Sequence, residues 1–463
     1  MLKWPGLPVM PRAVMLNLRQ QYAFPFLGTY LLCFIVYTYL FSSIIFTNHT
    51  LPNAWLYSYP SFKTWYEGRW FADFLIFIFG GSGVQSLQMF LATGIQVTNG
   101  LLFCRFLNVT DRFFIFLITS FLALHPAFLD YYSFTVDNIE FTFGDSLALI
   151  GVLTLDCLRY RYLGATICTA CFVLTIATYQ PKIALVAALL IIWCIKGAVS
   201  EDDLPRQSSS GPIGTVTSLG LDRILISVIV FLSAIGLYFL SLLATIRFDQ
   251  GNRNHINDVG HMLWSAALSY AEVIRDFTSR VDYLPHIFRP LPAAIIIGGI
   301  ITIVWGGWVT YRLRSLPAVF TLFLLPPALQ LSYIINDRTW EAAGRILSPQ
   351  AYVFAFFLVS LWSHKVTRAL AVTVTILMVY FFCIVGSQES NSAEMNMLFD
   401  VNKINRIVSR IEDVVPDLYA RHWPVVVVGD FSNVGRRRFT KYRNSLYSSQ
   451  KAHPFTSGEI NIL

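Results

Sequence analysis

Residues 224–245 read ILISVIVFLSAIGLYFLSLLAT, a run of 22 residues without one charged side chain. About 20 apolar residues are enough for a helix to cross the hydrocarbon core of a bilayer, so this stretch predicts a membrane-spanning helix. Similar runs recur along the chain, and they are continuous rather than alternating, which favours helices over strands. The sequence therefore predicts an all-α polytopic membrane protein.

The composition of the whole chain supports this class. Of its 463 residues 55% are hydrophobic and 13% are charged, and the mean hydropathy is +0.56. Soluble globular chains carry about 25% charged residues, so an ordinary soluble enzyme is excluded. The net charge of +7 indicates topology and contact with anionic membrane lipids rather than nucleic acid. The seven cysteines lie in or beside apolar runs and predict neither a disulfide framework nor a zinc site.

About eleven transmembrane helices are expected from the apolar runs. These runs are 24–46, 84–106, 112–129, 143–158, 163–178, 183–196, 223–245, 291–311, 316–334, 347–363 and 368–386. With the N-terminus in the cytoplasm, fourteen Lys and Arg fall in inner segments and five in short outer loops, as the positive-inside rule requires. Residues 72–83 are too short to span in the ordinary way and read as a re-entrant or interfacial segment, but a spanning segment would reverse all later loops.

Four regions are expected along the chain. Residues 1–198 form a first transmembrane half, and the Ser-, Gly- and Pro-rich residues 199–221 form a cytoplasmic linker. Residues 222–386 form a second half with a long outer loop at 246–290. Residues 387–463 are expected to form a small α/β appendage outside. Helical apolar spacing at 401–415 and a strand-like run at 424–430 carry this last prediction.

The first outer loop holds an unusual mixture, WYEGRWFAD at residues 65–73. Glu67 or Asp73 could accept a proton, Arg69 could clamp an anion, and Trp65 and Trp70 could stack on a sugar. An aromatic belt with a local ion pair is the plainer interpretation.

Further polar residues follow in the next two outer loops. Asp137 and Glu140 lie three residues apart, so on a helix they share one face, although acidic residues also favour helix N-termini. Asp145 lies at or inside the next apolar run, where a carboxylate tends to be paired or functional. Lys182 stands between two apolar runs, where it could contact a lipid phosphate or extend to the interface.

A late outer loop, residues 336–345, repeats the mixture of acid, arginine, aromatic and glycine. Arg338 and Arg345 are two helical turns apart and could face one pocket as phosphate forks, or they could form ordinary interfacial salt bridges. The chain has no nucleotide-binding glycine loop, which argues against an ATP-driven transporter and against a nucleotide-sugar enzyme of the soluble kind. Its histidines do not have the spacing of metal ligands.

Several short motifs resemble one known family, the serotype-converting O-antigen glucosyltransferases (Gtr) of enteric bacteria and their temperate phages. The similar stretches cover much of the membrane part: Trp65 with Gly68-Arg69 and Asp73, SFTVD at 133–137 after His125-Pro126, TYQP at 178–181, and Gly344-Arg345. The family often has an acidic pair early in the first outer loop, whereas residues 50–54 here contain no carboxylate. The resemblance therefore leaves the base open among Glu67, Asp73, Asp137 and Glu140.

The resemblance implies a GT-C-like glycosyltransferase in the bacterial inner membrane, and the Lys and Arg bias places its C-terminal region in the periplasm. The donor would be a sugar on undecaprenyl phosphate, typically glucose, and the acceptor a lipid-linked O-antigen. A sugar-lipid flippase and a donor synthase would be functional partners. No cofactor is implied, and a divalent metal is left open. A carboxylate base and arginines on the leaving phosphate suit this chemistry. The alternatives are a flippase or transporter of lipid-linked sugars, or another GT-C enzyme such as an O-antigen polymerase.

Overall fold

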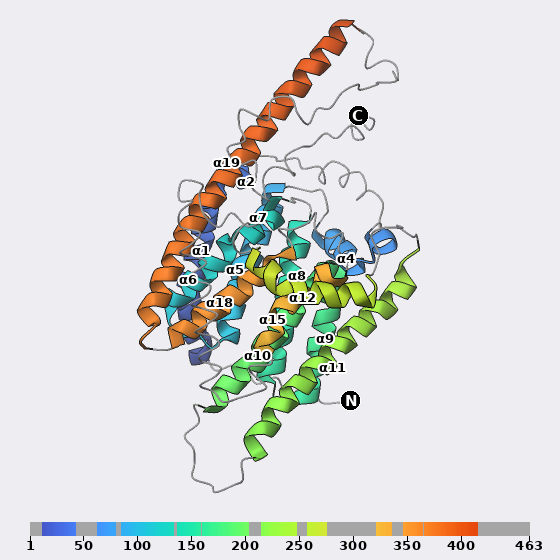
Figure 1. The fold of residues 1–463 in the computed structure, drawn as a ribbon. Coiled ribbons are helices and arrows are strands. Elements are labelled where there is room, and N and C mark those ends of the chain that lie inside the picture. The colour runs from blue at the N-terminus through green and yellow to red at the C-terminus, as the bar shows by residue number, and fades with distance from the viewer. Residues whose placement is uncertain are drawn as a thin grey trace, which may run out of the picture.

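All regular elements in the described part of the chain are helices (Figure 1). The computed structural model describes residues 12–42, 63–79, 85–133, 137–158, 160–202, 214–247, 257–275, 321–335, 346–363 and 365–414. The longer helices are α1 (Arg12–Val36), α4 (Trp70–Phe79), α5 (Gln85–Phe106), α6 (Arg112–Leu124), α7 (Pro126–Ser133), α8 (Asn138–Cys157), α9 (Arg161–Thr178), α10 (Ile183–Asp202), α11 (Gly214–Thr245), α12 (Val259–Arg275), α18 (Ser348–Ser363) and α19 (Arg368–Val414). The shorter pieces are α2 (Thr38–Ser42), η1 (Lys63–Glu67), η2 (Gln180–Lys182), α15 (Leu325–Leu329) and α16 (Leu331–Ile335).

Six helices in the described ranges are long and apolar enough to cross a membrane. They contain the predicted runs 84–106, 143–158, 163–178, 183–196, 223–245 and 368–386. The helices at Gln21–Val36 and Arg112–Leu124 are apolar but shorter, and α18 has 16 residues. The run 291–311 lies outside the described residues. A helical membrane protein is therefore confirmed, whereas the number of eleven spans stays a prediction.

Three predicted runs are interrupted. The run 112–129 ends as a helix at Leu124, because Pro126 cannot continue the hydrogen-bond ladder and begins α7 instead. The run 24–46 breaks between α1 and α2, and the described part of 316–334 is divided into α15 and α16.

The sequence predicted a domain boundary after residue 386, but helix α19 passes through this position without a break. Helix α19 continues through 47 residues to Val414, about 70 Å at 1.5 Å per residue, and projects beyond the other helices (Figure 1). The predicted helix at 401–415 is therefore the continuation of the last span. The strand predicted at 424–430 lies outside the described residues.

Helices also extend into both ends of the linker predicted at 199–221, since α10 continues to Asp202 and α11 begins at Gly214.

Helix α8 lies at the centre of the bundle and packs along both α5 and α9. It is buried over most of its length, whereas α11 exposes most of its apolar surface, as a helix at the lipid-facing perimeter would. The start of α8, η1, η2, α7 and the end of α11 lie at one end of the bundle, which we call the site end. The opposite end carries basic residues: Arg105, Arg112, Arg161, Lys196 and Arg368 near helix ends, and Arg223 in the first third of α11.

Candidate functional site

The first charged loop is folded into a tight turn before α4. The amides of Gly68 and Arg69 donate to the carbonyls of Thr64 and Lys63, at 3.2 and 3.0 Å. The carboxylate of Asp73 closes the turn by accepting from the backbone and hydroxyl of Thr64, at 2.6 and 2.5 Å. Burial raises the pKa of Asp73, against the opposite effect of these two hydrogen bonds. Asp73 thus shapes the loop, which weakens the case for it as the base.

This loop is held against helix α11. Gly68 has a φ of +70°, and a Cβ there would lie 2.3 Å from Cδ2 of Leu242, so only glycine suits the conformation and the close approach. The indole of Trp70 donates to Ser241 at 3.0 Å. The guanidinium of Arg247 lies 5.0 Å from the ring centroid of Trp65. Both tryptophans therefore contact other residues of the chain. Their stacking on a sugar stays a prediction from the sequence.

A lysine of this loop reaches the start of α8. Lys63 Nζ lies 2.8 Å from Oδ1 of Asp137 and 2.9 Å from both oxygens of Glu140. The three side chains are only 6%, 7% and 2% exposed. The predicted proximity of Asp137 and Glu140 is confirmed, and their shared partner is a cation that the sequence analysis did not single out.

A second charged pair lies in the same loop. Arg69 Nη1 is 3.2 Å from Oε2 of Glu67, with the side chains 18% and 16% exposed. The guanidinium also lies 4.7 Å from the ring centroid of Tyr179, and its Nε donates to Oε1 of Gln180 at 3.1 Å. The amide of Gln180 donates in turn to the carbonyl of Glu67.

The charge of Arg69 is strongly supported by its surroundings. Burial lowers the pKa of Arg69, but Glu67, Tyr179, Glu140 and Asp137 together raise it above its ordinary value. Because Asp137 and Glu140 act on Arg69, the two charged groups belong to one electrostatic site. This site, which we call the charged cluster, consists of Lys63, Glu67, Arg69, Asp137 and Glu140.

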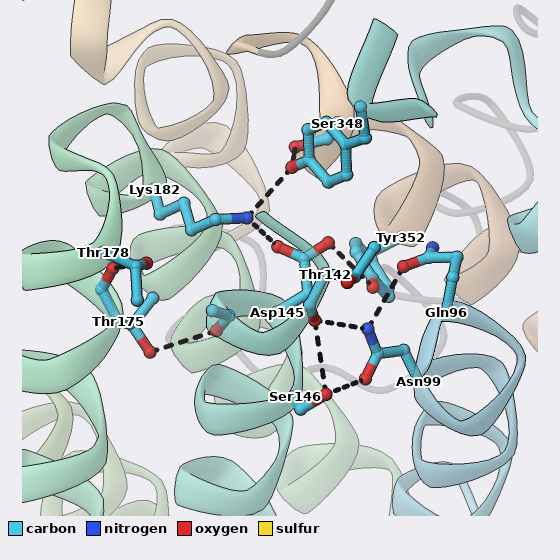
Figure 2. Close-up of polar contacts among 12 residues, drawn as sticks. Gln96, Asn99, Thr142, Asp145, Ser146, Thr175, Thr178, Lys182, Ser348 and Tyr352 are labelled. Carbon is cyan, nitrogen blue, oxygen red and sulfur yellow. Dashed lines mark hydrogen bonds and ion pairs between the residues drawn. The ribbon is translucent and has the colours of Figure 1, made fainter. Parts of the chain in front are cut away.

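Further into the bundle lies a buried ion pair between Lys182 and Asp145, with side chains 2% and 0% exposed (Figure 2). Nζ of Lys182 also donates to the hydroxyl of Tyr131 at 3.0 Å, and the hydroxyl of Tyr352 donates to Oδ2 of Asp145 at 3.3 Å. Gly144 permits this approach, since a Cβ there would lie 2.8 Å from Cε of Lys182. The alternative that Lys182 extends to the interface is therefore wrong.

Polar side chains continue this network between α5, α8 and α18. Nδ2 of Asn99 donates to Gln96 at 3.1 Å and to the carbonyl of Thr142 at 2.9 Å, and Ser146 donates to Asn99 at 2.6 Å (Figure 2). The hydroxyl of Tyr131 donates to Ser348 at 2.7 Å. The network fixes α8 relative to its neighbours just inside the charged cluster.

The predicted site residues divide into three groups. Glu67, Arg69, Asp137 and Glu140 are brought together, and Lys182 lies behind them within electrostatic reach of Glu140. Asp73, Trp65 and Trp70 shape and dock the loop. Arg338 and Arg345 lie outside the described residues.

Sequence reasoning missed Lys63, Gln180, Tyr131 and Tyr352 as partners. Gln180 could have been identified from the sequence, because it belongs to the TYQP motif at residues 178–181. Lys63 carried no signal beyond being a cation in an acidic loop, since its two partners are 74 and 77 residues away. In the ranges that the structure describes, no group of three His, Cys, Asp or Glu is arranged to hold a metal ion.

Comparisons with known proteins give one match. Neither the curated proteins nor the solved structures contain a match to this chain. The family described as glucosyl transferase GtrII matches residues 52–387, a range that includes the charged cluster and the buried network. This match spans well over half of the 463 residues. The chain therefore belongs to the GtrII glucosyltransferase family.

Proposed function

We propose that the protein transfers glucose from a polyprenyl phosphate carrier to lipid-linked O-antigen, at the periplasmic face of the bacterial inner membrane. The observation that carries this proposal is the charged cluster at one end of an apolar helix bundle, in a chain of a glucosyltransferase family. A lipid-linked donor presents its phosphate at the membrane surface, so arginine and carboxylate at the end of a bundle are well placed for it.

Arg69 is our candidate for the donor phosphate. A guanidinium offers several donors in a rigid fork that matches phosphate oxygens. Here Gln180 and Tyr179 fix its orientation. As the bond between glucose C1 and the phosphate oxygen breaks, negative charge grows on the leaving phosphate, and a fixed cation stabilises that charge. Arg338 and Arg345 are proposed as further phosphate contacts.

Glu67 is our candidate for the base. It is the most exposed of the three cluster carboxylates, and it forms an ion pair with Arg69. When the donor phosphate binds beside Arg69, the guanidinium shares its charge between the phosphate and Glu67, and Glu67 becomes a stronger base for the proton of the acceptor hydroxyl. The hydroxyl oxygen then bonds to C1, the proton passes to Glu67, and the carrier leaves as a phosphate monoester. Donor binding would thus precede activation of the base.

Asp137 and Glu140 have a different role in this scheme, because Lys63 holds both. A carboxylate near the anomeric carbon stabilises the oxocarbenium-like transition state of glycosyl chemistry. Asp137 stays the second candidate for the base. Lys182, held by Asp145, supports the site from inside the bundle, and Trp65 and Trp70 are proposed to border the sugar.

The orientation follows from charge. Basic residues at helix termini gather at the end opposite the charged cluster, and cytoplasmic ends of membrane helices are enriched in Lys and Arg. The site end would then be periplasmic. The projecting part of α19 lies on the same side, which agrees with a periplasmic C-terminal region (Figure 1).

One observation favours a second candidate, a flippase for lipid-linked sugars. The pair of Asp145 and Lys182 is buried among apolar helices, and such intramembrane charges also mark transport pathways. Another enzyme using the same donor on a different acceptor is a further alternative.

The test uses purified protein in detergent with polyprenyl phosphate [14C]glucose and lipid-linked O-antigen. The proposal expects labelled O-antigen without any membrane gradient, whereas a flippase would give none. Mass spectrometry of the host O-antigen, with and without the gene, should show one added hexose per repeat. An unchanged O-antigen mass with an active donor synthase present would refute the proposed acceptor.

A further inference from the structure

All three N–H groups of one buried ammonium are used at the charged cluster. Lys63 donates to one oxygen of Asp137 and to both oxygens of Glu140, at 2.8, 2.9 and 2.9 Å. An ammonium group has three donors and no acceptor. One carboxylate thus binds the cation through a single oxygen and the other through both.

Both carboxylates bind Lys63, although the backbone amides of the first turn of α8 lie next to them in the sequence. Asp137 directly precedes α8, where an aspartate normally accepts from the free amides of the first turn. Its side chain makes no such capping bond. Glu140, in the first turn, also points its oxygens at Lys63 rather than back to the helix start. Asp137 has φ and ψ of −100° and −4°, outside the extended region that a capping residue adopts, and its carboxylate is directed to Lys63 instead of the first-turn amides.

The same ligand set suits a hard divalent cation. Such ions take carboxylate oxygens in both the single and the double mode, and in phosphate chemistry they neutralise developing charge. In the charged cluster, Lys63 and Arg69 supply two positive charges against three carboxylates, Glu67, Asp137 and Glu140. Without Lys63, one cation would face three carboxylates, and an anionic donor would be repelled.

We propose that Lys63 is a built-in cation that takes the position of a divalent metal ion at this site, so that glucose transfer needs no added metal. This role rests on the proposed function. It predicts that removing the ammonium leaves an acidic pair that binds Mn²⁺ in its place. Asp137 and Glu140 stay together without Lys63, because both lie at the start of α8. If Lys63 only braced the loop, a metal ion bound at this pair would not restore transfer by Lys63→Ala, because the ion could not hold the loop against α8.

The first measurement is Mn²⁺ binding to purified protein, followed by electron paramagnetic resonance. Wild type should bind no Mn²⁺ at this site, and Lys63→Ala should bind one ion in the micromolar to millimolar range. The double variant Lys63→Ala with Glu140→Gln should lose that ion, which places it at this carboxylate pair. Absence of binding to a folded Lys63→Ala protein, or equal binding to the double variant, would overturn the proposal.

The second measurement is transfer of labelled glucose by wild type and by Lys63→Ala in the presence of EDTA. Wild type should keep its rate within about twofold. Lys63→Ala should be slower by about 10²-fold or more and should regain at least tenfold with Mn²⁺ or Mg²⁺. Loss of wild-type transfer in EDTA, restored by Mg²⁺, would refute the role of Lys63. Because Mn²⁺ binding does not depend on turnover, failure of the proposed function would be recognised separately, as absent transfer by a protein with the expected Mn²⁺ behaviour.

Discussion

Arg69 and Gln180 are 111 residues apart in the sequence, yet Nε of Arg69 donates to Oε1 of Gln180 at 3.1 Å. The amide of the same Gln180 donates to the carbonyl of Glu67. One glutamine thus holds both the cation and the backbone that carries the carboxylate. The short turn before α10 thereby sets the geometry of the charged loop that precedes α4.

Arg69→Lys tests the phosphate fork. The ammonium cannot keep the bond to Gln180 and the contact with the phosphate together, since it is a compact point charge. We expect transfer efficiency to fall at least tenfold, mostly through a higher KM for the donor. Arg161→Lys is the matched control, because its pair with Asp222 is exposed and spans 3.8 Å, and such a pair contributes about 0–1 kcal/mol. Near wild-type kinetics for both variants, measured with polyprenyl phosphate glucose, would make Arg69 structural.

Asp145 and Lys182 should behave as a coupled pair. Asp145→Leu leaves a buried ammonium without its carboxylate, and breaking a buried pair costs about 3–5 kcal/mol. The single variant should therefore unfold at a clearly lower temperature in detergent. Replacing both, Asp145→Leu with Lys182→Met, removes the unpaired charge and should recover most of the loss. Equal unfolding temperatures for the single and double variants would show that the two residues are not coupled.

Gly68→Ala tests how the charged loop is docked on α11. A left-handed conformation costs an alanine about 1–2 kcal/mol, and its Cβ would meet the side chain of Leu242. We expect reduced transfer because the loop shifts Glu67 and Arg69. Adding Leu242→Ala should relieve the contact and restore part of the activity, leaving the backbone cost. Full activity of Gly68→Ala alone would contradict this picture of the loop.

Reporter fusions test the orientation. A fusion at residue 210, in the segment between α10 and α11, should report the cytoplasm, and one at residue 450 should report the periplasm. The reason is the gathering of Lys and Arg at one end of the bundle. If both fusions report the same side, the number of spans between them is wrong.

The helices were predictable from sequence because apolar length is a local property. The runs predicted at 84–106 and 163–178 lie within two residues of the ends of α5 and α9. Helices α8, α10 and α11 were also located, but each extends five to nine residues beyond the predicted run at one end, where polar residues continue the helix. The breaks were harder. The predicted run 112–129 passed through Pro126, where the helix in fact ends. The interruption between α15 and α16 falls at Gln330, a residue that carries no turn signal of its own.

The site was predictable only in part. Asp137 and Glu140 share a helix face, so their proximity followed from their spacing. Their partner Lys63 comes from another loop, and only the fold brings it there. Lys182 was placed at the interface by its neighbours in sequence, whereas Asp145 holds it inside. Pairs formed across distant segments are fixed by tertiary packing, and a single sequence contains no direct signal for them.

The central claim is that Glu67 accepts the acceptor proton in a glucosyl transfer. The most direct measurement compares wild type and Glu67→Gln for transfer of labelled glucose from polyprenyl phosphate to lipid-linked O-antigen, with purified proteins. Asp222→Asn serves as the matched control, because it removes an exposed carboxylate that is paired with Arg161. The account predicts transfer by wild type and by the control, and a rate about 10²–10⁴-fold lower for Glu67→Gln with the donor still bound. Wild-type rates for Glu67→Gln would contradict it.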